Sequence, residues 1–220
     1  MNLNISNTIL DIVKDFNVIA YDIEFNDTYN ALTKSTNVDL ILNDIYQKYP
    51  KKFEYDTITK IPKLKNTRDG YKALGKDPSH TRPAPEALLR RVVRQNKLYR
   101  LGDVIDLGNI LSLYTLRSVC VVDYDKLVGD VEIKLGTTLD NYEGINRGII
   151  NVSNIPIYTD SLGAFGCPTS DTIRTMVTKD TKRILIMIIC FDSSLMNEDE
   201  QTLKELYLNN TQVKKITKIK

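Results

Sequence analysis

The sequence predicts an α+β fold, because helical and β-type segments are grouped along the chain. Two long stretches with helical spacing of apolar residues, 84–97 and 103–116, lie near the middle. Short segments of β texture follow them, separated by glycines, with no regular strand–helix–strand repeat. The longest apolar run, 184–191, has eight residues. That length suits a buried strand and is too short for a membrane span.

The first third of the chain contains shorter elements. Residues 18–25 partly alternate between apolar and polar side chains, which predicts a strand. Residues 38–48 carry apolar side chains at near-helical spacing, and Pro50 is expected to end that helix. The lysine-rich segment 51–66 is expected to be a connection.

The two middle helices have recognisable starts and faces. In 84–97, Pro85 stands where a first-turn proline is tolerated, and Glu86 complements the positive end of the helix dipole. In 103–116, apolar residues form one broad face. Both stretches are therefore predicted to be helices that cover a core.

The second half of the chain is predicted to be mainly β structure. Helices at 170–178 and 198–208 are expected to interrupt and close it. The predicted strands are 118–122, 130–135, 147–151, 155–159 and 183–191.

Composition indicates one globular domain over 1–220. The chain has 42% hydrophobic and 26% charged residues, with a net charge of +2. This balance neither requires nor excludes a polyanionic partner. Polar residues interrupt any early apolar run, so neither a secretory signal nor a membrane span is expected.

The cysteines and the single histidine do not form a metal motif. Cys120, Cys167, Cys190 and His80 are widely spaced, and no Cys-x-x-Cys pair occurs. A zinc site is therefore not expected, and no other metal or organic cofactor is indicated. An odd number of unpaired cysteines favours a reducing compartment, so the chain is predicted to be cytoplasmic.

Four segments between residues 65 and 192 occur in a characteristic order. The first is YKALGKDPS at 71–79, leading into Arg82-Pro and EALLRR at 86–91. The second joins VIDLGN at 104–109 to CVVDYDKL at 120–127. The third is YEG at 142–144, and the fourth is GCPTSDTIRT at 166–175.

This order and spacing resemble the tRNA-editing (B3/B4) domain of the phenylalanyl-tRNA synthetase β chain and its freestanding relatives. The resemblance implies a layered β-sandwich core of unusual topology with flanking helices. It also implies hydrolysis, in trans, of the ester between a wrong amino acid and the terminal adenosine of tRNA. The implied partner is the aminoacylated 3′ end of tRNA, with no role for DNA or a membrane. For some relatives, the amino acid is a non-protein mimic of arginine.

Such a reaction does not require a catalytic triad. An aminoacyl ester is already activated, so the protein must mainly hold it, orient a water and stabilise an oxyanion. Polar side chains and backbone N–H groups suffice, so a single histidine is no objection.

Asn109 is the leading catalytic candidate. Asparagine and glycine are both poor helix-interior residues, yet Gly108 and Asn109 are adjacent within 103–116. A helix boundary or a buried hydrogen bond is the alternative explanation. The resemblance implies that Asn109 lines the editing pocket and that Gly108 allows the substrate to approach closely.

Further candidates come from the β-rich half. By resemblance, Cys120 falls where editing pockets can carry a histidine, although its valine neighbours equally indicate a buried strand cysteine. Glu143-Gly144 is either a plain turn or the border of the amino-acid pocket. Asp160 follows a predicted strand, and the resemblance implies contact with the substrate amine as a second catalytic group.

The segment Thr169-Ser170-Asp171 is predicted to cap the helix 170–178. A hydroxyl residue there would be an ordinary N-cap, but an exposed helix N-terminus also attracts an anion or an oxyanion. Arg174, one turn further on, would clamp a carboxylate or phosphate. All four residues are therefore candidate substrate-binding residues.

A basic helical face is the candidate tRNA contact. Arg90, Arg94 and Lys97 share one face of 84–97, and Arg82 precedes it. Such a face is either simply solvated or follows RNA phosphates.

Two other functions fit the same sequence. A non-catalytic tRNA-binding module would keep the basic face but need no polar pocket, and a small-molecule hydrolase would have a closed pocket. Within the editing hypothesis, the predicted pocket acids outnumber Arg174, which favours a cationic substrate side chain. These acids are Asp106, Glu143, Asp160 and Asp171.

Overall fold

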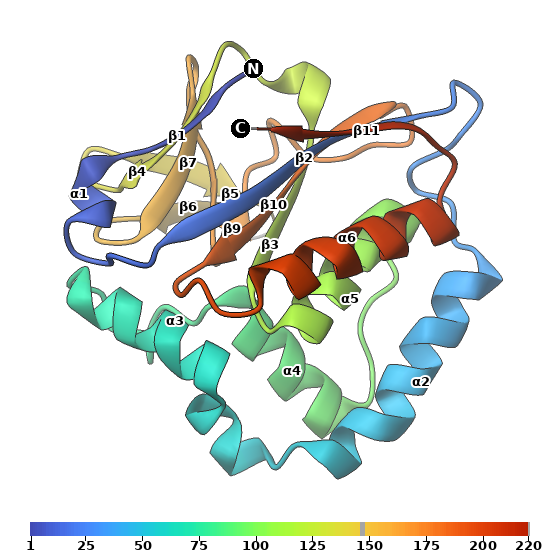
Figure 1. Ribbon diagram of the computed structural model, residues 1–220, viewed down its shortest axis with the longest axis horizontal. Coiled ribbons are helices and arrows are strands. Elements are labelled where there is room, and N and C mark those ends of the chain that lie inside the picture. The colour runs from blue at the N-terminus through green and yellow to red at the C-terminus, as the bar shows by residue number, and fades with distance from the viewer. Residues whose placement is uncertain (146–147, 220) are drawn as a thin grey trace.

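The computed structural model describes residues 1–145 and 148–219 and has three layers, two sheets and a helical layer (Figure 1). The first sheet is antiparallel, with strand order β11-β2-β10-β3, so β3 and β11 are its edges. Its strands are β2 (Asn17–Phe25), β3 (Ser118–Asp123), β10 (Arg183–Cys190) and β11 (Val213–Ile219).

The second sheet packs against one face of the first and has the order β1-β4-β7-β8-β9. Strand β1 runs parallel to β4, and the other pairs are antiparallel. A separate hairpin is formed by β5 (Asn141–Gly144) and β6 (Gly148–Asn151). The bounds in the second sheet are β1 (Leu3–Ile5), β4 (Val131–Leu135), β7 (Pro156–Asp160), β8 (Gly163–Cys167) and β9 (Ser170–Asp171).

Helices cover the opposite face of the first sheet (Figure 1). Helices α2, α4, α5 and α6 contribute most of the residues that pack there, while α1 and α3 contribute to the core between the sheets. The helices are α1 (Asn7–Leu10), α2 (Thr36–Lys52), α3 (Pro62–Ala73), α4 (Ala84–Gln95), α5 (Asp103–Thr115) and α6 (Met196–Asn210). Two 3-10 helices, η1 (Tyr55–Lys60) and η2 (Tyr124–Lys126), complete the fold.

Strand β10 is buried on both faces. Ile184, Ile186 and Ile188 belong to the core under the helices. Leu185 and Met187 belong to the core between the sheets. Because successive side chains on a strand point to opposite faces, this placement explains the uninterrupted apolar run of the sequence.

The α+β prediction and most predicted elements of the β-rich half are confirmed. The helices predicted at 84–97, 103–116 and 198–208 correspond to α4, α5 and α6. The strands predicted at 18–25, 118–122, 130–135, 155–159 and 183–191 correspond to β2, β3, β4, β7 and β10. Of the strand predicted at 147–151, Arg147 lies outside the described residues, and the rest is β6.

The helix predicted at 170–178 is wrong. Residues Ser170 and Asp171 form β9, which pairs with β8, and Thr172 makes a bridge to Gly144. The rest of the segment is turn and irregular structure, and the Thr175 carbonyl accepts from the backbone N–H of Asp123. The segment is rich in β-branched residues, which disfavour a helix, and cross-strand bonds supply the partners that a helix would have provided.

The prediction for 38–66 is also corrected. Helix α2 continues through Pro50 to Lys52, and Tyr49 in this last turn is a core side chain. The expected connection 51–66 contains η1 and the start of α3. Pro62 does not break this helix, since it occupies the first turn of α3, where a missing N–H has no cost.

Gly108 is required for packing between α5 and β3. A Cβ atom at this position would lie 2.6 Å from Cγ2 of Val121. Gly108 is buried and does not line the cavity described below. The proposed role in close substrate approach is therefore wrong, and the glycine instead brings the helix axis close to the sheet.

We expect Gly108→Ala to lower the free energy of unfolding by about 1–3 kcal/mol, because the overpacking exceeds the gain in helix propensity. Urea denaturation monitored by circular dichroism measures this change. The double variant Gly108→Ala/Val121→Ala should be less destabilised than the sum of the two single variants. Simple additivity would show that the methyl group is accommodated elsewhere.

Candidate functional site

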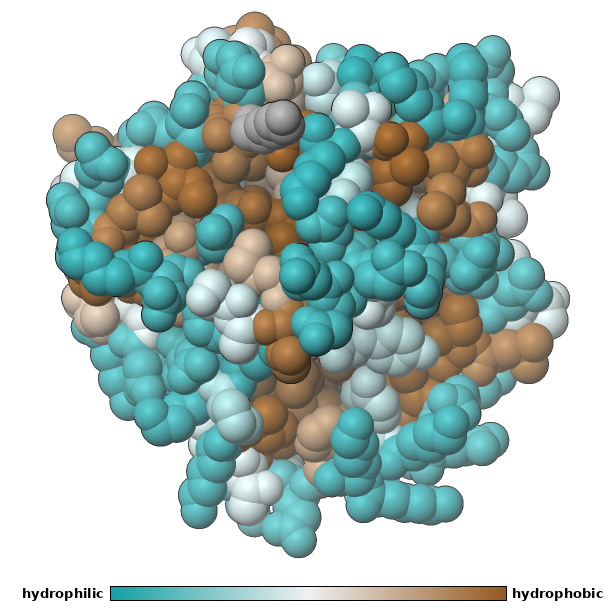
Figure 2. Space-filling view, in the orientation of Figure 1, coloured by the Kyte–Doolittle hydropathy of each residue, from teal (hydrophilic) through white to brown (hydrophobic). Residues whose placement is uncertain are grey.

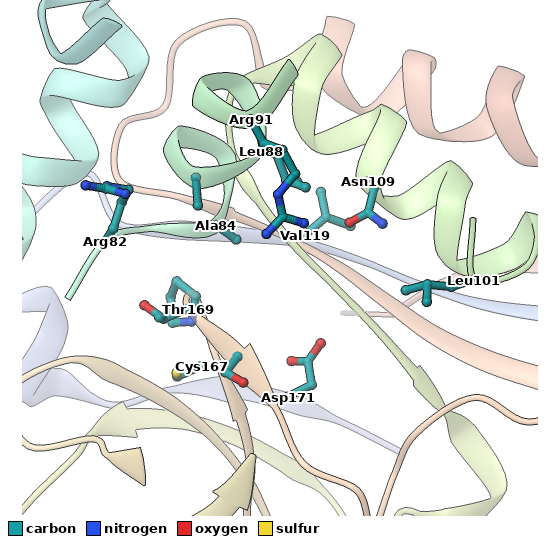
Figure 3. Close-up of a pocket in the computed structure, with 13 residues that line it drawn as sticks. Arg82, Ala84, Leu88, Arg91, Leu101, Asn109, Val119, Cys167, Thr169 and Asp171 are labelled. Carbon is teal, nitrogen blue, oxygen red and sulfur yellow. The ribbon is translucent and has the colours of Figure 1, made fainter. Parts of the chain in front are cut away.

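A cavity of about 310 Å³, with both polar and apolar lining residues, opens between helices α4 and α5, strand β3 and the β8–β9 turn (Figure 3). It lies where β3, an edge of the first sheet, and β9, an edge of the second, approach each other. The cavity is half open to solvent. Its walls are formed by Arg82, Ala84, Ala87, Leu88, Arg91, Leu101, Asn109, Val119 and residues 167–171.

Hydrogen bonds fix the β8–β9 turn against the helical layer. The carbonyl oxygen of Pro168 accepts from the backbone N–H of Ala84 at 2.9 Å and from Oγ of Ser118 at 3.1 Å. On the other side of the turn, the hydroxyl of Tyr142 donates to the Ser170 carbonyl at 2.5 Å. The start of α4, strand β3 and strand β5 therefore hold this wall of the cavity in one position.

Asn109 projects into the cavity from the middle of α5 (Figure 3). It lies neither at a helix boundary nor in a buried hydrogen bond, which were the alternative explanations. Within residues 1–145 and 148–219 its side-chain amide makes no hydrogen bond. The amide is therefore available to donate to, or accept from, a bound molecule.

Asp171 faces the same space from the opposite wall (Figure 3). Its carboxylate lies against Gly166, where a Cβ atom would come within 2.7 Å of Oδ1. Burial raises the pKa of Asp171 to about 7, although a hydrogen bond with the Cys120 thiol favours the ionised form. The side chain is therefore poised to change charge near neutral pH.

The two cysteines near the cavity are buried. Cys167 lines the cavity, and its sulfur is 3.1 Å from the hydroxyl of Tyr142. Cys120 is 1% exposed and belongs to the core between the sheets, whereas its neighbour Val119 faces the cavity. Burial raises the pKa of both thiols. Neither cysteine therefore has the properties of an activated nucleophile.

The segment 169–171 lines the cavity, as predicted, but not as a helix N-terminus. Thr169 lies in the β8–β9 turn and Ser170 begins β9, and their backbone N–H groups bond to the sulfur of Cys167. No helix dipole is directed at the cavity from this wall. The segment 169–171 therefore does not stabilise an anion as a helix N-terminus would.

Asp160 and Arg174 form an ion pair with each other. The Arg174 guanidinium donates to both carboxylate oxygens, at 2.9 and 3.0 Å, and the carboxylate also accepts from the backbone N–H groups of Val128 and Leu162. Neither residue lines the cavity. Arg174 holds the pKa of Asp160 below its usual value against the opposing effect of burial. The structure thus joins these two candidates to each other and separates them from Asn109.

Two more predicted positions lie outside the cavity walls. Glu143 is an exposed residue of β5, and Gly144 packs against Ile150 of the same hairpin. The predicted acidic pocket is therefore not formed. Asp106 accepts from the backbone N–H groups of Leu101 and Gly102 and pairs with Arg100, so Asp171 is the one acid among the described residues of the wall.

The four basic residues predicted to contact tRNA have different surroundings. Arg90 donates to the buried Glu86 at 2.9 Å and to the Tyr55 carbonyl at 3.2 Å, so it supports the fold. Arg94 lies over the ring of Tyr55, and Lys97 is exposed. Arg82 lines the cavity.

Arg91 is a wall residue that the sequence analysis did not select. Ala84, Ala87, Leu88 and Arg91 follow the i, i+3, i+4, i+7 spacing of one helical face, and all four line the cavity. This spacing was visible in the sequence. The cations selected from the sequence, Arg90, Arg94 and Lys97, lie on an adjacent face of the same stretch.

The described residues contain no group of three or more His, Cys, Asp and Glu side chains placed to hold a metal ion. In the same part of the chain, no helix is both long and apolar enough to cross a membrane.

The fold and the cavity define an α+β protein with a candidate site between two edge strands. The chain belongs to the B3/4 domain family, which it matches over residues 66–216. The resemblance inferred from the sequence over 65–192 is thus confirmed.

The structure is similar to the crystal structure of an N-terminal fragment of the phenylalanyl-tRNA synthetase β-subunit from Pyrococcus horikoshii, with a TM-score of 0.54. The two chains are 11% identical, and the match covers 98% of this chain and 50% of that chain. The chain therefore spans half the length of the fragment, and the likeness shows a shared fold. No curated protein matches this chain in sequence.

We expect Asp171→Asn to increase stability more at pH 8 than at pH 5. The native state retains a proton up to a pKa of about 7, whereas an unfolded aspartate releases it near pH 3.9. The unfolded state thus binds fewer protons in this window, and the stability of the wild type falls as pH rises through it.

The difference between the two pH values should be about 1–3 kcal/mol, measured by urea unfolding. The exposed Asp180 provides a control. The variant Asp180→Asn should change stability equally at both pH values. The same result for Asp171→Asn would mean that the carboxylate is not desolvated.

Proposed function

We propose that this chain is a trans-editing hydrolase that deacylates mischarged aminoacyl-tRNA. The observation that carries the proposal is the uncommitted amide of Asn109 opposite the half-buried carboxylate of Asp171, in a B3/4 domain cavity. The similar fold of the phenylalanyl-tRNA synthetase β-subunit fragment supports the proposal that the substrate includes tRNA.

The proposed mechanism assigns roles by position. The Asn109 amide orients the attacking water or the ester carbonyl, in a hydrogen bond that strengthens in the transition state. Asp171 receives a cationic group of the amino acid. Arg82 and Arg91, at the cavity wall, contact phosphates of the terminal nucleotides. Asp160 and Arg174 have no part in this mechanism, since they satisfy each other.

Residues outside the matched segment support a single domain over 1–220. Strand β1 completes the second sheet, and β2 lies inside the first. The three cysteines are free and buried, which supports a reducing, cytoplasmic environment.

Purified protein should release amino acid from at least one mischarged tRNA in the presence of a chelator. We expect Asn109→Ala to lower kcat about tenfold or more, which corresponds to the loss of one hydrogen bond made in the transition state. The control is Asn43→Ala, at an exposed position on helix α2.

Both variants should keep the circular dichroism spectrum of the wild type. Unchanged kinetics in Asn109→Ala would remove its proposed role. Binding of tRNA without hydrolysis across a broad panel would favour the non-catalytic binding module. Hydrolysis restricted to short esters would favour a small-molecule hydrolase.

We further propose that the amino acid carries a cationic side chain, such as an arginine mimic. Asp171 is in position to form a charge-assisted hydrogen bond with it. We expect Asp171→Asn to lower kcat/KM for esters of arginine-like amino acids about tenfold more than for neutral ones. Equal losses of kcat/KM for both kinds of ester would mean that Asp171 binds the α-ammonium group, which all substrates share. A wild-type preference for neutral aromatic esters would contradict the proposal.

A further inference from the structure

Positive charge is concentrated in one quarter of the chain. Residues 48–100 contain 15 of the 30 lysines and arginines but only 5 of the 28 acidic residues. Their net charge is +10, whereas the rest of the chain has −8. This segment forms the end of α2, η1, α3 and α4. A separation of this size creates an extended positive field although the whole chain is almost neutral.

Several of these cations are committed within the fold. Lys63 pairs with the buried Asp199, and Arg100 pairs with Asp39, Asp103 and Asp106. These pairs stabilise the fold and are not available to a partner.

A second depression of about 370 Å³ lies on the outer side of α3, and we call it the basic groove. Lys65, Arg68 and Lys72 follow one face of this helix, and Lys60 reaches the groove from η1. Asp69 is the one acid among its described lining residues. The remaining lining residue is Thr59.

The lysines of the basic groove are free to exchange partners. Lys65 and Lys72 are both 63% exposed and share Asp69, at 2.5 and 3.8 Å. Exposed pairs of this kind contribute about 0–1 kcal/mol, so a phosphate can replace the carboxylate at little cost. Lys60 is exposed as well. Hydrophilic side chains dominate the surface over η1 and the adjoining helix ends (Figure 2).

The basic groove is connected to the cavity through one buried carboxylate. Arg68 of the groove donates to Glu86 at 2.8 Å, and Arg82 of the cavity wall lies 3.3 Å from the other oxygen of the same carboxylate. One lining residue of each site therefore contacts the same carboxylate.

We propose that the basic groove binds the phosphate backbone of the RNA strand that carries the ester in the cavity. The identity of the RNA as tRNA rests on the proposed function. Lys65 and Lys72 are seven residues apart, about 10 Å along the helix axis, so they can contact different phosphates of one strand. Contacts of this kind supply affinity and register without sequence specificity.

Surface chemistry argues against an anionic membrane as the occupant. Basic helices that lie on membranes also bury apolar side chains in the lipid. The exposed large apolar residues nearest in sequence are Leu40 and Tyr99, and residues 48–98 contain none. The residues that line the groove itself are all polar, and the exposed Ile12 lies in a neighbouring depression that shares Asp69.

The test measures binding of uncharged tRNA to the triple variant Lys60→Gln/Lys65→Gln/Lys72→Gln at several salt concentrations. We expect Kd to rise about tenfold at low salt and the salt slope to fall by about 2, as expected when two to three phosphate contacts are lost. The control is Lys34→Gln/Lys179→Gln/Lys215→Gln, which removes the same charge from exposed positions outside the segment. The control should bind like the wild type.

Equal binding by the triple variant and the control would overturn the proposal. So would a triple variant that loses binding to phosphatidylserine vesicles but retains tRNA binding. Because uncharged tRNA is the probe, the result does not depend on hydrolysis. If the wild type hydrolyses no ester but the triple variant loses tRNA affinity, the groove proposal stands and the hydrolase proposal fails. Unchanged kcat/KM for aminoacyl-tRNA in the triple variant would support the hydrolase and reject the basic groove as an RNA-binding site.

Discussion

The whole architecture depends on the burial of strand β10 between two cores. Its alternate side chains pack under the helices and against the second sheet. Each large aliphatic side chain buried in this way contributes about 1.5–3 kcal/mol. The strand therefore fixes the distance between the helical layer and the second sheet. The cavity exists because the first sheet ends at β3, where these outer layers meet with no further strand between them.

Periodicity was enough to predict the elements that are buried in a regular way. The apolar run of β10 and the broad apolar face of α5 indicate their structure directly, and Asn109 stood out as a poor helix former inside a helix. Local sequence preference gave wrong predictions where hydrogen bonds between distant segments determine the structure. The threonine-rich segment after Pro168 joins β8 and Gly144, and Pro62 begins α3 although the composition around it suggested a connection.

Site chemistry was harder to predict, because partners are distant in sequence. The Asp160–Arg174 pair and the cluster around Glu86 each neutralise charges that the sequence shows as free. Conversely, Arg91 enters the cavity because its helical face turns toward β3, which only the packing of α4 determines. The number of charges in a segment therefore says little about which of them a ligand can use.

Strand pairing in the first sheet has a consequence for biosynthesis. Strand β2 is made early, but its two neighbours, β10 and β11, are made last. Pairings so distant in sequence carry a high contact order and form slowly. Until they form, the apolar side chains of β2 have neither of the strands that flank them in the native sheet. The nascent chain is thus exposed to aggregation during most of its synthesis, and a chaperone that shields β2 would increase the yield of native protein.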